Sequence, residues 1–169
     1  RALNLYQQSL DLLEHLGDQQ GKAASLHQMA AIFLTRGDLD RALNLYQQSL
    51  DLLEHLGDLQ GKAASLGNLA NIHMQQGNWD TAEELLLEAL QITEQIGEPP
   101  AFELVKLGQV AQARGETETA LARYREGLAI FQRLGMPRET AQVQQMIAQL
   151  ENRRPRRSQR TPRSDAASD

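Results

Sequence analysis

Apolar residues recur along this chain with the spacing of an α-helix. Between residues 39 and 56 they are Ala42, Leu43, Leu45, Tyr46, Leu50, Leu52, Leu53 and Leu56. Such spacing forms one broad helical face, whereas a half-buried strand would alternate every second residue. We therefore expect an all-α chain, with helices over about residues 1–16, 20–36, 39–56, 60–76, 79–96, 101–114, 117–134 and 138–152.

Glycines mark the expected ends of these helices in two regular series. Gly17, Gly57, Gly97 and Gly135 form one series, and Gly37, Gly77 and Gly115 form the other. Glycine is the usual residue where a helix ends in a left-handed conformation. Asp18, Asp38 and Asn78 follow three of these glycines, and their side chains suit the start of the next helix.

The chain also repeats itself. Residues 1–26 recur as residues 41–66 with one difference, Gln19 against Leu59. A fixed period in this size range is typical of solenoids, in which each structural repeat packs on its neighbours and a long concave surface results.

The positions that recur identify the kind of helical repeat. HEAT, armadillo and tetratricopeptide repeats all suit a helical period near 40. The first full unit carries Leu26, Met29, Ala30, Phe33, Ala42 and Tyr46. The next two carry Leu66, Leu69, Ala70, His73, Ala82 and Leu86, and then Leu104, Leu107, Gly108, Ala111, Ala120 and Tyr124. This pattern resembles the tetratricopeptide repeat family over residues 1–152, in its subgroup with repeats of about 40 residues rather than 34. The usual proline after the second helix is missing.

The resemblance implies a right-handed α-solenoid of antiparallel helix pairs, with about eight helices in all. We expect a half repeat at 1–18, full repeats at 19–58, 59–98 and 99–136, and a capping helix at 137–152. In this family the first helix of each unit lines a concave groove.

Candidate groove residues lie on those first helices, at positions that the core does not use. They are His27, Leu34, Asn68, Asn71, Met74, Gln75, Phe102, Val105, Lys106 and Gln109, with Ala24, Ala31, Ala64 and Gln112 nearby. The resemblance implies that Asn71 holds the backbone of an extended peptide, since an amide donates to a C=O and accepts from an N–H at once. The alternative is that Asn71 is an ordinary solvated residue.

A clamp for a C-terminal carboxylate is a further possibility in this family. Asn68, Asn71 and Lys106 match three of its positions, but His27 stands where a lysine is usual and Ala31 where an asparagine is usual. We therefore expect a groove of apolar and amide groups, suited to an extended peptide or an amphipathic helix.

Charge is distributed unevenly along the chain. The net charge is −5, yet residues 153–169 carry six arginines and two aspartates. This segment has no large apolar residue, so we expect a disordered tail. Aromatic residues do not interleave with its arginines, which removes the stacking part of single-strand binding. A solubilising tail is therefore favoured over nucleic-acid association.

Several kinds of chemistry are not expected. The chain has no cysteine, and its four histidines never occur with the spacing of a metal site. Phosphate-binding, nucleophile-elbow and zinc-protease motifs are absent from the sequence. No apolar run approaches the roughly 20 residues that cross a bilayer. We expect no catalytic residue, metal, cofactor or membrane contact, and a cytoplasmic location.

The sequence begins in what reads as the second helix of a unit. The face formed by Leu3, Leu5, Tyr6, Leu10 and Leu13 is expected to pack on a preceding helix. A longer parent array would cover it, and self-association is the other account.

Together these features predict a protein–protein interaction module, not an enzyme, within a larger scaffold. The alternatives are a sensor or regulatory segment of a bacterial multidomain signalling protein, such as an NTPase or transcription regulator, and nucleic-acid association through the basic tail.

Overall fold

The computed structural model describes residues 2–152, and within them every regular element is a helix. The helices are α1 (Ala2–Leu16), α2 (Gln19–Thr35), α3 (Leu39–Leu56), α4 (Leu59–Gln75), α5 (Trp79–Gln95), α6 (Ala101–Ala113), α7 (Thr117–Arg133) and α8 (Pro137–Asn152). The all-α prediction is confirmed, and each helix begins and ends within one residue of the range expected from the sequence. The expected disordered tail, 153–169, lies outside the described residues.

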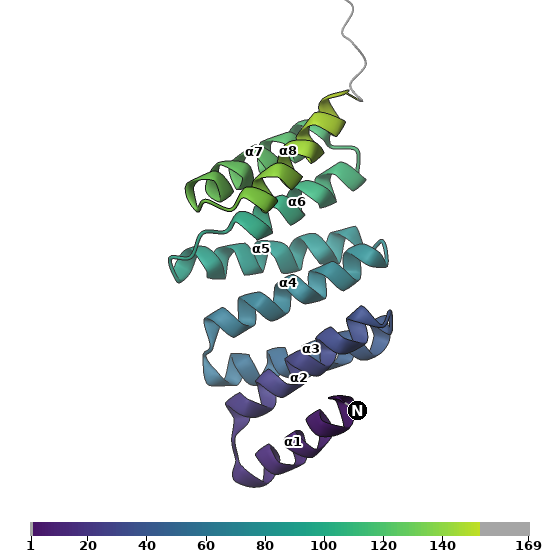
Figure 1. Cartoon of the computed structure of the whole chain (residues 1–169), viewed down its shortest axis with the longest axis vertical. Coiled ribbons are helices and arrows are strands. Elements are labelled where there is room, and N and C mark those ends of the chain that lie inside the picture. The colour runs from purple at the N-terminus through teal and green to yellow at the C-terminus, as the bar shows by residue number, and fades with distance from the viewer. Residues whose placement is uncertain (1, 153–169) are drawn as a thin grey trace, which may run out of the picture.

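The helices stack one after another along a single axis, with α1 at one end and α8 at the other (Figure 1). The closest pairs are α2 with α3, α4 with α5 and α6 with α7, and each pair then packs on the next. This is an α-solenoid. Within residues 2–152, no helix combines the length and the apolar character that crossing a membrane requires.

Short turns join the helices with the chemistry that the sequence indicated. Gly57 ends α3 at a φ of 70°, a left-handed conformation that favours glycine. The Asp58 carboxylate then accepts a hydrogen bond from the Gly61 N–H at 2.9 Å, which caps the start of α4. Asn78 differs from the expectation, because its amide contacts Gln76 and His73 and makes no cap bond.

Small residues allow the paired helices to approach closely. Ala30 in α2 and Ala42 in α3 are both fully buried. In the third pair, a Cβ added to Gly108 would lie 2.6 Å from two ring carbons of Tyr124. The tyrosine ring thus fills the space that a larger residue on α6 would need.

The faces of α1 differ from those expected. Leu10 is buried against Leu26 and Met29 of α2, so a preceding helix is not needed to cover it. Tyr6 packs on the same cluster, and Leu13 is partly buried. The exposed large residues of the helix are Leu5, Leu12 and Leu16, with exposed fractions of 64%, 61% and 70%. Side-chain placement at Leu3 lies outside the described part of the chain. Both faces of α1 are apolar, and the sequence alone did not show which one α2 covers.

We predict that Gly108→Ala destabilises the fold. Alanine favours a helix over glycine by roughly 0.5–1 kcal/mol. Forcing a methyl group into a packed core typically costs about 1–3 kcal/mol, and the buried Tyr124 ring has little room to move. Urea unfolding should therefore show a lower midpoint for the variant.

Gly67→Ala is the matched control, because this glycine is also helical and buried. A Cβ there would meet only the flexible end of Lys106, with Nζ at 3.3 Å. Its midpoint should fall by less than that of Gly108→Ala, because the end of the lysine side chain can shift and alanine favours the helix. Equal losses in both variants would contradict the assignment of the Tyr124 contact as the cause.

Candidate functional site

The first helices α2 and α4 are joined by a hydrogen-bonded histidine. Nδ1 of His27 lies 3.3 Å from Oγ of Ser65, and Nε2 lies 3.3 Å from Nδ2 of Asn68. An amide nitrogen can only donate, so Nε2 accepts from Asn68 and Nδ1–H donates to the serine. The ring also packs edge-on against Tyr46, with centroids 5.0 Å apart. His27 and Asn68, both predicted as groove residues, therefore bind each other across two repeats.

Burial adds to this preference for the neutral imidazole. It lowers the pKa of His27 below the ordinary 6.5, because the charged form loses hydration. The neutral form is also the one that can accept from Asn68.

Lys106 makes the corresponding connection between α6 and α4. Its Nζ donates to the Gly67 carbonyl at 3.1 Å. Glycine at this position leaves room for the ammonium group, since a Cβ would lie 3.3 Å from it. Burial lowers the pKa of Lys106, and the nearby Glu103 opposes that shift in part. The lysine therefore joins two repeats, and its ammonium group is not displayed for an anionic ligand.

Asn71 differs from these neighbours. Its side chain on α4 is partly buried, and within residues 2–152 its amide makes no side-chain hydrogen bond. Gln109 on α6 is partly buried and Gln75 is exposed, and their amides are likewise unpaired in the described range. These three predicted residues keep their full hydrogen-bonding capacity.

The apolar candidates are distributed along the solenoid rather than gathered in one patch. Leu34, Met74 and Val105 are partly buried, and each packs on a different core cluster. Phe102 is 52% exposed, and its ring lies edge-on against Phe131 of α7 at 5.0 Å.

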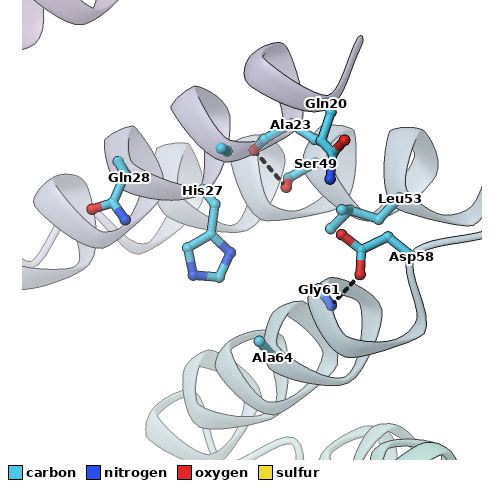
Figure 2. Close-up of a pocket in the computed structure, with 10 residues that line it drawn as sticks. Gln20, Ala23, His27, Gln28, Ser49, Leu53, Asp58, Gly61 and Ala64 are labelled. Atoms are coloured by element: carbon cyan, nitrogen blue, oxygen red, sulfur yellow. Dashed lines mark hydrogen bonds between the residues drawn. The ribbon is translucent and has the colours of Figure 1, made fainter. Parts of the chain in front are cut away.

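A pocket of about 290 Å³ opens between α2, α3 and α4 (Figure 2). Ala23, Ser49 and Leu53 are buried in it, and the other lining residues are Gln20, Ala24, His27, Gln28, Asp58, Gly61 and Ala64. Ala24, His27 and Ala64 were named from the sequence. The neighbouring residues of α2 and of the start of α4 were not named, nor were Ser49 and Leu53, which belong to the second helix α3. The available signal was the concentration of Ala and Gly on facing helices.

A second hollow, of about 520 Å³, lies between α6, α7 and α8. Its lining consists of Gln109, Gln112, Ala113, Tyr124, Met146, Gln149 and Leu150. The Tyr124 hydroxyl donates to Oε1 of Gln112 at 2.7 Å, and burial raises the pKa of this tyrosine to about 12. Each hollow thus lies between one helix pair and the helix that follows it, and each carries glutamine amides.

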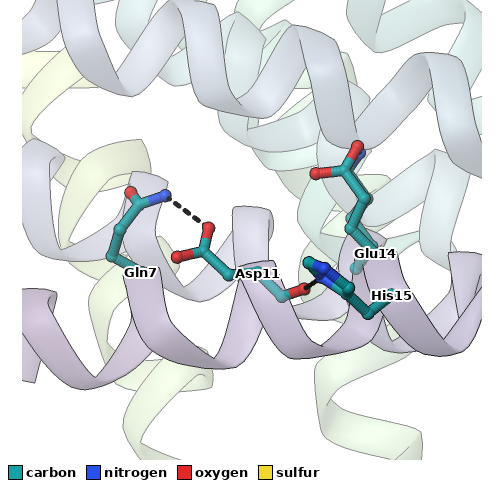
Figure 3. A network of polar contacts seen from close by, with 5 residues as sticks. Gln7, Asp11, Glu14 and His15 are labelled. Carbon is teal, nitrogen blue, oxygen red and sulfur yellow. Dashed lines mark hydrogen bonds and ion pairs between the residues drawn. The ribbon is translucent and has the colours of Figure 1, made fainter.

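Histidines outside the site make local bonds. His15 Nδ1 lies 2.7 Å from the Asp11 carbonyl of its own helix, beside a bond from Gln7 to the Asp11 carboxylate (Figure 3). The duplicated His55 repeats the contact with Asp51. In the part of the chain that the structure describes, no group of three or more His, Asp or Glu side chains could hold a metal ion.

We predict that His27 makes the fold sensitive to mild acid. Its folded pKa is lowered, so the unfolded chain takes up the proton first and stability falls as the pH drops through 6.5. Urea midpoints at about pH 7.5 and about pH 5 should show a smaller acid loss for His27→Gln than for the wild type. His55→Gln, which removes an exposed imidazole, should keep the wild-type loss. An unchanged acid loss in His27→Gln would contradict this role.

Comparison with known structures shows the same architecture at low sequence identity. BtubC (BKLC) from P. vanneervenii is 18% identical, with a TM-score of 0.71 over 93% of this chain and 77% of that one. The N-terminal domain of stress-induced protein-1 (STI-1) from C. elegans is 12% identical, with a TM-score of 0.62 over 79% and 98%. A putative kinesin light chain from Podosopora anserina, described as having nearly identical TPR-like repeats, is 18% identical, with a TM-score of 0.60 over 89% and 85%. These likenesses establish the fold alone.

The sequence itself settles the family. No curated protein matches the chain in sequence. The family model for the tetratricopeptide repeat matches residues 1–55 and 61–133, which confirms the resemblance seen in the recurring positions. This chain belongs to the tetratricopeptide repeat family.

Proposed function

We propose that this chain is a non-enzymatic interaction module that holds an extended peptide along its first helices. Tetratricopeptide repeats generally bind protein partners, and the finer assignment here rests on one observation. Asn71 presents a partly buried amide without a partner on α4, about one turn after Gly67 and Asn68, whose polar groups are already paired. An unpaired amide at such a place can donate to one peptide group and accept from another.

The neighbouring bonds support a neutral groove. The His27 imidazole is held between Ser65 and Asn68, and the Lys106 ammonium is held on the Gly67 carbonyl. Free amides remain at Asn71 and Gln109. A carboxylate clamp also needs cationic partners, and here His27 is held in its neutral form while the Lys106 ammonium is bonded to Gly67. The proposed ligand is therefore an internal peptide segment rather than a C-terminal carboxylate.

We also propose that the chain is part of a larger scaffold or signalling protein. The absence of cysteine suits a location in the reducing cytoplasm. A sensor segment in a bacterial signalling protein would use the same groove. Association with nucleic acid concerns the arginine-rich tail, which lies outside the described residues.

Selection from a random peptide display library tests the groove directly. We predict that peptides enriched on the wild type bind Asn71→Ala about tenfold more weakly or worse, because a peptide polar group loses its partner on binding. Asn44→Ala is the matched control, since it removes an exposed asparagine from the second helix α3.

A second comparison separates the internal peptide from a captured C-terminus. Amidation of the C-terminal carboxylate of an enriched peptide should leave its affinity unchanged, as should Lys106→Met. Loss of affinity on amidation would support the carboxylate clamp. Equal affinities for wild type and Asn71→Ala would contradict the groove assignment.

A further inference from the structure

The pocket between α2, α3 and α4 has a counterpart that the chain fills by itself. Aligning the repeats on Leu26, Leu66 and Leu104 places Ala24 and Ala64 at the position of Phe102. On the second helices, alignment on Ala42, Ala82 and Ala120 places Leu53 and Thr93 at the position of Phe131. Phe102 and Phe131 stack edge-on at 5.0 Å. In the first repeat, Ala24 and Leu53 line a hollow instead.

Contacts in the two repeats support this alignment. The Ser49 hydroxyl donates to the Ala23 carbonyl at 2.9 Å. At the aligned place in the third repeat, a Cβ on Gly127 would lie 3.1 Å from the Ala101 carbonyl. The two pairs of helices therefore meet in the same register. Ala24 and Leu53, which line the pocket, stand at the positions of Phe102 and Phe131 in the third repeat.

The buried polar groups that line the pocket are already hydrogen-bonded, which favours an apolar ligand group. Ser49 is bonded to Ala23, the Asp58 carboxylate caps the Gly61 N–H, and both ring nitrogens of His27 are paired. Within residues 2–152, no buried side-chain polar atom lacks a hydrogen-bond partner. Among the polar side chains of the lining, only the exposed amides of Gln20 and Gln28 are without a bond. A charged or strongly polar group that went deeper, to Ser49 and Leu53, would lose hydration without compensation.

The space is sufficient for an aromatic ring. A cavity of about 150 Å³ lined by apolar side chains binds benzene, and this pocket measures about 290 Å³. Ala24 and Ala64 are exposed at its rim, so a side chain can enter from solvent.

We propose that this pocket takes one aromatic side chain of the bound peptide, at the place that Phe102 occupies in the third repeat. This inference rests on the proposed groove function, and it names the class of peptide side chain that the groove would select. Rings from Phe, Tyr or Trp should be preferred over aliphatic or charged side chains at this one position of the peptide.

A small probe tests the pocket without a known peptide. N-acetyl-L-phenylalanine methylamide is titrated into the isotope-labelled chain, and amide chemical shifts are followed by NMR. We predict saturable shifts at Ala23, Ala24, His27 and Ala64, and at least about threefold weaker binding of the leucine analogue. Phenylalanine-induced shifts that are scattered over the surface, or no stronger than those with leucine, would overturn the proposal.

Filling the pocket from within provides the matched variants. Ala24→Phe places a ring on the pocket wall and should abolish the localised shifts, whereas Ala129→Phe adds the same ring at an exposed position on α7 and should preserve them. Circular dichroism checks that each variant is folded, and Ala64→Phe closes the pocket from α4 if Ala24→Phe does not fold. Localised shifts that persist in a folded pocket-filled variant would refute the site.

The peptide selection separates this inference from the groove assignment. Peptides that need Asn71 but carry no fixed aromatic position, and bind Ala24→Phe as well as wild type, would leave the groove standing and refute the pocket. Conversely, peptides insensitive to Asn71→Ala would refute the groove, and the NMR titration would still decide whether the pocket accepts a ring.

Discussion

The close approach of two helices within each repeat is the contact on which the rest of this structure depends. The fully buried Ala30 and Ala42 allow α2 and α3 to approach closely. Gly108 on α6 leaves room for the ring of Tyr124 on α7. A single amphipathic helix in water is marginal, and packing against a partner supplies most of its stability. Once each pair is fixed, its second helix presents an apolar side to the next pair. The stacking direction of the solenoid follows, and so does the alignment of α2, α4 and α6 on which the candidate site is built.

Polar contacts then make the junctions between repeats unlike one another. The first junction uses a neutral histidine between serine and asparagine, and the second uses a lysine on a backbone carbonyl. Hydrophobic packing alone would permit many similar junctions, whereas each of these bonds requires a particular pair of residues. They therefore give individual chemistry to a scaffold whose apolar contacts are nearly uniform.

Much of the fold was predictable because it depends on local and periodic signals. Glycines mark the ends of the helices, and small residues at fixed spacing identify the pairs. The site was less predictable, because it depends on which way single side chains turn. Lys106 lies at the expected position, but its ammonium group reaches Gly67, 39 residues earlier, where the missing Cβ makes room. Similarly, Leu10 and Leu12 both belong to apolar faces of α1, and only packing shows that α2 covers Leu10. The pocket was not predictable from the first helices alone, because Ser49 and Leu53 in its lining come from the second helix α3.

The near identity of residues 1–26 and 41–66 has an evolutionary consequence. Any change in copy number by one full period inserts or removes a unit whose two packing sides already match its neighbours. Recombination between the duplicated stretches of DNA would therefore yield arrays that differ in length but not in the way they stack. The His27 and Lys106 contacts would then be separated by a different number of repeats. In such a lineage, ligand length can diversify faster than the fold itself.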